Sequence, residues 1–373
     1  MIGMVASTLI YYRVEAFKKY FQSKELLILS LFFWIAFLSG VYSDDKSYWL
    51  NWVRIRIPFL VLPLAFAPLK KLDDKKLILI LYSFILTLLI STTAVLINYR
   101  LHYDAINDSF TRGGTIPMPY SHIRYTLMLA FSFFCSIYLF EKKYFLFNKN
   151  EKWLQVTCAA FAFIALHVLL VRSGLLALYL GLAYIALRGL TRRKKPVRSA
   201  LIIALLIATP FIAFRSIPGL QNKLEYIRYD LEQYQKGDIN EYSDAMRILS
   251  MKMGVELWQK NLWLGVGPGD LKIEMDKIYA ADYPQISEAN RRLPHNQFIW
   301  ALATTGIVGF TLFLFAFFYP LIIMRHYRHW LLLVLYIVIF SSFFTEDTFE
   351  EQIGAGFYII FLLLLLNHLK HDE

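Results

Sequence analysis

Apolar blocks close to the length of a membrane span recur along this chain of 373 residues. A helix needs about 20 apolar residues to cross the hydrocarbon core of a bilayer. The clearest blocks contain no Asp, Glu, Lys or Arg, and they are residues 26–42, 77–97, 156–171, 200–214, 331–344 and 357–366. The chain is 57% hydrophobic, above the roughly 45–50% of soluble domains. These features predict an all-α polytopic membrane protein.

Ten spans follow from the hydropathy pattern. They are predicted at 26–42, 55–69, 77–97, 122–140, 154–171, 174–188, 199–216, 295–323, 330–345 and 353–369. The second is short and contains Pro58, Pro63 and Pro68. Proline removes a backbone donor, so we expect this helix to be kinked or irregular.

Basic residues fall on one side of the membrane if ten spans are correct. They gather in the connections 13–24, 70–76, 142–152, 188–198 and 325–328. Because Lys and Arg are enriched in cytoplasmic loops, we expect these connections and both termini in the cytoplasm. The rule also accounts for the net charge of +11. No basic soluble module with interleaved aromatics appears, so a nucleic-acid partner is not expected.

The opposite, extracytoplasmic side holds the one long connection, residues 217–294. Apolar residues recur at helical spacing in 222–235, 243–260 and 271–279, so we predict an amphipathic helical segment. Glycines and a proline at 265–269 separate the last two helices. Three parts are therefore predicted: an N-terminal membrane bundle (1–216), an extracytoplasmic helical loop (217–294) and C-terminal membrane helices (295–373).

His295 and Asn296 stand where this loop meets an apolar helix, in PHNQFIWALATTGIVGF. Histidine is the side chain best able to move a proton near neutral pH, and polar groups at the membrane edge are costly unless used. His295 is thus a candidate general base, although a histidine at a helix entry also suits a structural hydrogen bond. Asn296 is a candidate for substrate contact or for helix capping.

Further basic residues are predicted near the same face. Arg172 lies between two apolar runs, Arg124 opens the fourth span with His122 two residues before it, Arg215 ends the seventh span, and Arg247 lies on an amphipathic helix. A guanidinium can bind phosphate oxygens with two parallel hydrogen bonds. The four arginines are candidate anion ligands, and His122 is a candidate substrate contact; arginines that merely reach the interface are the alternative.

Other chemistry is weakly supported. The carboxylates of Glu346, Asp347, Glu350 and Glu351 are expected in a solvated outer turn, unless the helices bring them to His295. Asp44 and Asp45 could form a metal or base pair, but two adjacent aspartates in a short loop are usually solvated. Cys135 and Cys158 lack metal-ligand spacing and are expected in the core. The sequence contains no HExxH, Walker A, Rossmann or GxSxG motif.

Together these segments resemble the O-antigen ligase and polymerase superfamily. HNQFIWALATTGIVGF is similar to its HN-x-x-L-x-x-L-x-x-x-G-x-x-G-x-x-x-F signature, and VRSGLLALYLGL to its S-R-G-x-x-L-A-L segment, with Val171 in place of Ser. DAMRILSMKMGVELWQKNLWLGVGPGD resembles the element that precedes the histidine, with Asn261 and Leu262 near the usual Pro. SHIRYTLML and FFTEDTFEEQIGAGFY are also similar. The resemblance covers residues 26 to 369, in a family whose members often have twelve spans.

The resemblance implies a metal-independent glycosyltransferase of the C-type membrane fold without a cofactor. Its donor would be a glycan on undecaprenyl diphosphate at the periplasmic face, and its acceptor would be lipid A–core or another lipid-linked glycan. His295 would be the general base, and Arg172, Arg247 and, less strongly, Arg124 would bind the diphosphate.

Three alternatives stay open from the sequence. A polymerase or a protein O-oligosaccharyltransferase would share the donor and the base and differ in the acceptor. A transporter or flippase would also carry broken helices, although the polar residues gather at one face and no two-fold repeat appears.

Overall fold

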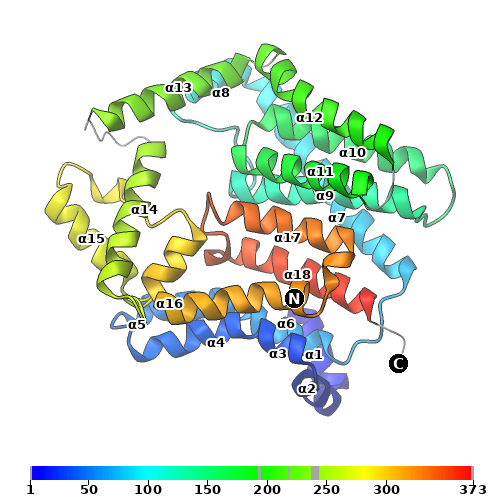
Figure 1. Cartoon of the computed structure of the whole chain (residues 1–373), viewed down its shortest axis with the longest axis horizontal. Helices are drawn as coiled ribbons and strands as arrows, with labels where there is room; N and C mark the ends of the chain where they lie inside the picture. Colours follow the sequence, from blue (N-terminus) through cyan, green and yellow to red (C-terminus); the bar gives the residue numbers. More distant parts are fainter. Residues whose placement is uncertain (1, 192–194, 217, 237–242, 371–373) are drawn as a thin grey trace. The chain divides into compact units, whose positions relative to one another are not determined.

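The computed structural model describes residues 2–191, 195–216, 218–236 and 243–370, and these are helical without strands (Figure 1). The first part of the chain forms α1 Ile2–Tyr11, α2 Arg13–Gln22, α3 Lys24–Leu29, α4 Leu31–Leu38, η1 Ser39–Val41, α5 Lys46–Arg56, α6 Pro58–Phe66, α7 Asp74–Leu101, α8 Tyr103–Phe110, α9 His122–Lys142, α10 Glu151–Leu169 and α11 Arg172–Thr191. The rest forms α12 Pro196–Ser216, α13 Pro218–Gln235, α14 Ser243–Lys260, α15 Leu271–Asp282, η2 Glu288–Asn290, α16 Gln297–Phe318, η3 Tyr319–Ile323, η4 His326–Arg328, α17 Trp330–Ser342, η5 Thr348–Glu350 and α18 Gln352–Leu369.

The prediction of a polytopic all-α membrane protein is confirmed. Within the described ranges, nine helical segments are long and apolar enough to cross a membrane, with α3 and α4 joined in one segment and α5 and α6 in another. The remaining predicted span corresponds to α17, which has 13 residues. At about 1.5 Å per residue α17 is roughly 20 Å long, short of a full crossing. The expected helices of the long loop are present as α13, α14 and α15.

One predicted loop is wrong. Residues 43–54 lie between the first two predicted spans and are thus predicted as an outer connection, but most of them form α5. Asp45 begins this helix, because its Oδ1 accepts from Tyr48 N at 2.9 Å as an N-cap. Because α5 contains several polar residues, the hydropathy pattern did not predict this helix. The second predicted span is irregular, as expected from its prolines. It is divided between α5, which ends at Arg56, and α6, which begins with Pro58 and contains Pro63.

The chain packs as two compact units, each discontinuous in sequence. Unit 1 comprises the described residues of Met1–Asp73, Ala245–Leu333 and Phe343–Glu373, and unit 2 those of Asp74–Asp244 and Val334–Ser342. This division is by packing. The predicted division at residues 216 and 294 is by position relative to the membrane, and it stays a prediction.

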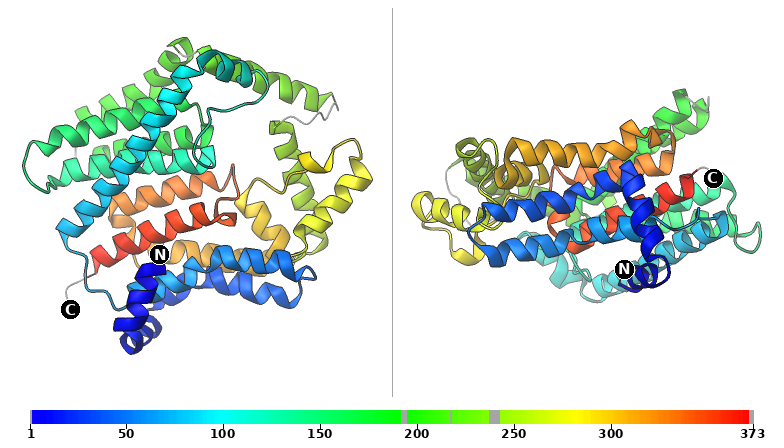
Figure 2. Two further views of the ribbon diagram at one scale, coloured as in Figure 1. Left: turned by 180° about the vertical axis from the view of Figure 1, so that it is seen from behind. Right: turned by 90° about the horizontal axis from the view of Figure 1, so that it is seen from below.

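Unit 1 is built around an aromatic cluster. In it α4 lies beside α16, and α6 lies beside α18 (Figures 1 and 2). The Phe349 ring is fully buried and packs against Phe32, Phe59, Phe313, Phe317, Phe343 and Tyr358, at centroid distances of 5.0 to 6.4 Å. Such rings bury a large apolar area and fix how neighbouring helices meet. Phe349 therefore anchors the connection between α17 and α18 in the core of unit 1.

A break in α16 is the most unusual backbone feature of unit 1. Gly306 has φ +61° and ψ −166°, which are not helical values, so α16 is kinked at this residue. The ribbon of α16 in Figure 1 is bent along its length. The loop after α14 supplies the hydrogen bonds that the break leaves unmade: Val266 N donates to Ala303 O at 2.8 Å, and Ile307 N donates to Leu262 O at 2.9 Å. A broken membrane helix is tolerated when neighbouring groups satisfy its backbone in this way.

Unit 2 centres on α9, which packs against α7, α10 and α11. Two glycines of α11 allow close approach, since a Cβ on Gly174 would lie 2.5 Å from Thr126 Cβ, and one on Gly181 would lie 2.3 Å from Phe134 Cζ. Small residues at helix contacts are common in membrane proteins.

Cys135 and Cys158 are buried and unpaired, as expected. By contrast α12 is apolar and mostly exposed, as a lipid-facing helix would be.

Candidate active site

His295 precedes the first turn of α16, and Asn296 caps that helix. The Asn296 Oδ1 accepts from Phe298 N at 3.0 Å and from Ile299 N at 3.1 Å, while its Nδ2 donates to Phe344 O at 3.2 Å. The side chain is 9% exposed. Of the two roles considered for Asn296, capping is the one that this geometry shows.

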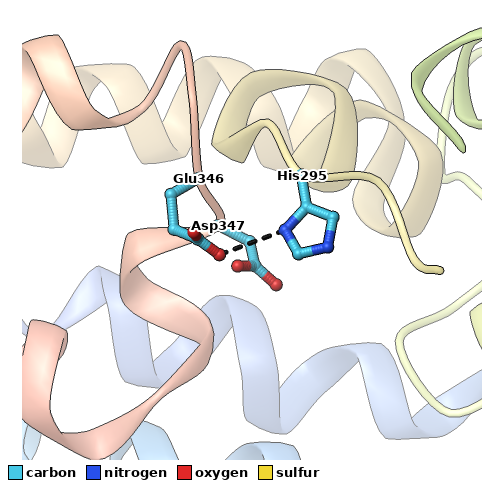
Figure 3. A group of neighbouring side chains, drawn as sticks. All are labelled: His295, Glu346 and Asp347. Atoms are coloured by element: carbon cyan, nitrogen blue, oxygen red, sulfur yellow. Dashed lines mark hydrogen bonds and ion pairs between the residues drawn. The ribbon is translucent and has the colours of Figure 1, made fainter. Parts of the chain in front are cut away.

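His295 faces an acidic group from the connection between α17 and α18. Its Nδ1 lies 3.2 Å from Glu346 Oε1, with the imidazole 23% exposed and the carboxylate 6% exposed (Figure 3). When Nδ1–H donates to this carboxylate, the lone pair of the ring is on Nε2. An oriented imidazole of this kind can take a proton at Nε2 while the carboxylate stabilises the resulting cation.

Asp347 adds a second carboxylate beside the ring. Among the described residues, ligand atoms of His295, Glu346 and Asp347 lie within 4.8 Å of one another. Imidazole and carboxylate donors are those that bind Zn²⁺ and related divalent ions. The geometry therefore offers three ligands to a cation, and the expectation of a metal-independent site stays a prediction.

A buried polar network lies next to the histidine. The Gln297 side chain is fully buried; it donates to Glu350 Oε1 at 2.7 Å and accepts from Phe349 N at 2.8 Å. Glu350 also accepts from Arg56 Nη2 at 2.5 Å and from Trp52 Nε1. The Arg56 side chain is 3% exposed. The outer turn that the sequence suggested is thus largely buried at Glu346 and Glu350.

Arg247 belongs to the same unit as His295. It lies partly buried on α14, seven residues before Gly254 and so on the same face of that helix. A Cβ on Gly254 would lie 2.7 Å from Ile299 Cγ2 and 2.8 Å from Pro294 Cγ, which means that this face packs against the start of α16. Arg247 therefore lies about 10 Å along α14 from the contact next to His295.

The other candidate residues belong to unit 2. Gly174 of α11 is in contact with Thr126 of α9. Arg172 lies two residues before Gly174, and Arg124 lies two residues before Thr126. The two arginines are therefore at the same end of the α9–α11 pair. Arg124 is 4% exposed and donates to Ser121 Oγ at 3.2 Å. Arg172 Nη2 contacts both Asp244 carboxylate oxygens, at 2.7 and 3.0 Å. His122 begins α9 and is partly exposed; Arg215 is exposed in the last turn of α12.

Part of this chain is similar to a known protein family. Residues 157–314 match the family model described as O-Antigen ligase. This segment, less than half of the chain, is similar to the O-antigen ligase family. The resemblance to the O-antigen ligase and polymerase superfamily is thereby confirmed. No curated protein gives a significant sequence match.

The O-antigen ligase domain includes some candidate residues and leaves out others. Arg172, Arg215, Arg247, His295 and Asn296 lie inside the matched segment. Arg124, His122 and the carboxylates of the last connection lie outside it. The site around His295 is thus completed by residues beyond the domain, namely Glu346 and Asp347.

Sequence reasoning missed several residues that pair with the candidate groups. Arg56, Gln297 and Asp244 were not singled out. For Arg56 a signal existed, because an arginine inside the apolar run 55–69 is expensive unless it is paired. For Asp44 and Asp45 the structure shows other roles: both backbone N–H groups donate to the Asp270 carboxylate, at 2.8 and 2.9 Å.

Proposed function

We propose that this protein transfers a glycan from undecaprenyl diphosphate to an acceptor at the periplasmic face of the bacterial inner membrane, with lipid A–core as the preferred acceptor. The O-antigen ligase domain supports a glycosyltransferase of the ligase or polymerase type. The observation that carries the proposal further is the contact between His295 and Glu346, because it gives the site an oriented base at the start of a membrane helix.

In this proposal the acceptor hydroxyl attacks the anomeric carbon of the donor. The bond from that carbon to the diphosphate oxygen breaks, and the hydroxyl proton passes to His295 Nε2. Glu346 balances the charge on the ring. Attack opposite the leaving group inverts the anomeric centre. The donor bond supplies the driving force, so no nucleotide is required.

The leaving group is a carrier diphosphate that gains negative charge as the bond breaks. Arginines stabilise such charge without a metal. We assign this role to Arg172 and Arg247, with Arg124 and Arg215 as secondary candidates and His122 as a candidate substrate contact. In the structure the Arg172 guanidinium is hydrogen-bonded to the Asp244 carboxylate. The donor phosphate would replace this carboxylate as the partner of Arg172.

An acceptor-exchange assay tests this function. Membranes containing the protein are given one labelled undecaprenyl-diphosphate glycan and, separately, lipid A–core, a second lipid-linked glycan or a secreted acceptor protein. We expect label on lipid A–core. Label on the lipid-linked glycan would make the protein a polymerase, and label on the protein would make it an O-oligosaccharyltransferase. Movement of unreacted donor across the membrane, without transfer, would replace the proposal with a flippase.

A further inference from the structure

The segment that carries Glu346 is tied to the start of α16 on both sides of this residue. On one side, Gln297 N donates to Phe343 O at 2.9 Å, and Asn296 Nδ2 donates to Phe344 O at 3.2 Å. On the other side, Phe349 N donates to Gln297 Oε1 at 2.8 Å. Glu346 lies between these two attachments, so the backbone that carries its carboxylate is held on both sides.

The second attachment is itself held by a buried ion pair. Glu350 Oε1 accepts from Gln297 Nε2 at 2.7 Å and from Arg56 Nη2 at 2.5 Å. Glu350 is 7% exposed and Arg56 is 3% exposed, so both charges are removed from water. Glu350 therefore joins α5, the start of α16 and the connection before α18 at one point.

Arg56 is not fully used by the described residues. Its Nε and Nη1 are buried and have no hydrogen-bond partner. A cavity of about 20 Å³ is lined by Arg56, Gln297, Trp52 and Thr305, among others. This volume fits an ordered water, which needs roughly 10–15 Å³ and several polar partners.

We infer that Gln297 and Glu350 are positioning residues that keep the Glu346 carboxylate on His295 Nδ1. The inference rests on the proposed function of His295. Gln297 is fully buried and so acts through the loop, not by touching a substrate. The contact they maintain is already long, at 3.2 Å against roughly 2.7–2.9 Å for charge-assisted hydrogen bonds. A small shift of the loop would therefore release the ring and its orientation.

The first test compares two buried amides of unit 1. Gln297→Met removes the attachment with little change in volume. Asn367→Leu is the matched control, because Asn367 is also buried and holds a loop through Leu72 N at 2.8 Å and Leu69 O at 3.4 Å. We expect Gln297→Met to lower kcat for glycan transfer at least about tenfold while the donor KM changes less than about threefold. The control should keep the wild-type kcat.

An exchange of the two side chains separates positioning from general loss of structure. Gln297→Glu places two carboxylates opposite each other, and Glu350→Gln removes the charge that pairs with Arg56, so each should lower kcat. The double variant restores an amide donor and a carboxylate acceptor between positions 297 and 350. It also keeps one carboxylate beside the cavity that Arg56 lines, so it should recover much of the lost kcat. Thermal unfolding of each single variant, measured beside kcat, shows whether its loss of kcat comes from unfolding.

The outcomes distinguish this inference from the proposed function. If His295→Ala abolishes transfer but Gln297→Met and Glu350→Gln both keep the wild-type kcat, the positioning role is overturned and the function stands. Failure of the double variant to recover, when it is folded, also overturns the role. If His295→Ala transfers glycan as well as the wild type, the proposed function itself fails.

Discussion

At the scale of single residues, Arg172 is the candidate of unit 2 with the clearest geometry, and it is already paired with a carboxylate. Arg172 is 54% exposed and presents its guanidinium to Asp244, whose N–H in turn donates to the buried carboxylate of Asp230 at 2.9 Å. A carboxylate and a phosphate offer a guanidinium similar pairs of oxygens. One nitrogen, Nη2, makes both contacts to Asp244, so the guanidinium reaches two acidic oxygens, as the proposed diphosphate contact would need.

Lysine substitution tests whether the arginines bind phosphate. Lysine keeps the charge and the reach but lacks the planar fork, so Arg172→Lys and Arg247→Lys should each raise the donor KM about tenfold. Arg228→Lys is the control, because Arg228 is a highly exposed arginine that pairs with Glu232. Transfer kinetics at varied donor concentration give the answer. Wild-type donor KM in both lysine variants would show that the arginines merely reach the interface.

The acidic cluster at His295 makes the metal question testable. We expect EDTA to leave the transfer rate unchanged, because the arginines supply the positive charge at the leaving group. A rate that EDTA abolishes and a divalent ion restores would contradict this. In that case Asp347→Asn should weaken the response to the ion, since Asp347 lies in the one cluster of suitable ligands among the described residues.

At the scale of elements, the break in α16 is held in place by another part of unit 1. The loop at residues 262–267 pairs with α16 on both sides of Gly306, and Gly265 approaches so closely that a Cβ there would lie 2.4 Å from Thr304 C. The start of α16, which carries His295, therefore takes its direction from the end of α14. The glycine-rich segment 265–269, which was predicted to separate two helices, thus also packs against the break in α16.

Alanine at Gly306 should disrupt this arrangement. Its backbone angles are accessible almost exclusively to glycine and cost a side-chain residue about 1–3 kcal/mol. A Cβ would also lie 2.3 Å from Trp263 C and O. We expect a clear fall in the thermal unfolding midpoint of the purified protein in detergent. Gly356→Ala is the control: no atom lies within 4 Å of its Cβ, and alanine favours the helix. Equal midpoints for both variants would contradict the role of Gly306.

At the scale of the whole molecule, the sequence predicts what depends on local composition. Spans such as 77–97 and helices such as 243–260 follow from length and period. The position of His295 at a helix entry followed in the same way. Long-range contacts could not be predicted: Glu346 is 51 residues from His295, and Glu350 is 294 residues from Arg56. The start of α5 was missed because its capping aspartate and polar residues resemble a loop.

The central claim is that His295 is the base of a glycan transfer, and one measurement tests it most directly. Purified wild-type protein and His295→Ala are reconstituted with labelled undecaprenyl-diphosphate glycan and lipid A–core, and the initial rate of label transfer is measured. His102→Ala is the control, since His102 is exposed and lies just after α7, where its Nδ1 bonds to Asn98 O. We predict a loss of about a hundredfold or more for His295→Ala alone, with unchanged thermal unfolding. A folded His295→Ala protein that transfers glycan at the wild-type rate would contradict the account.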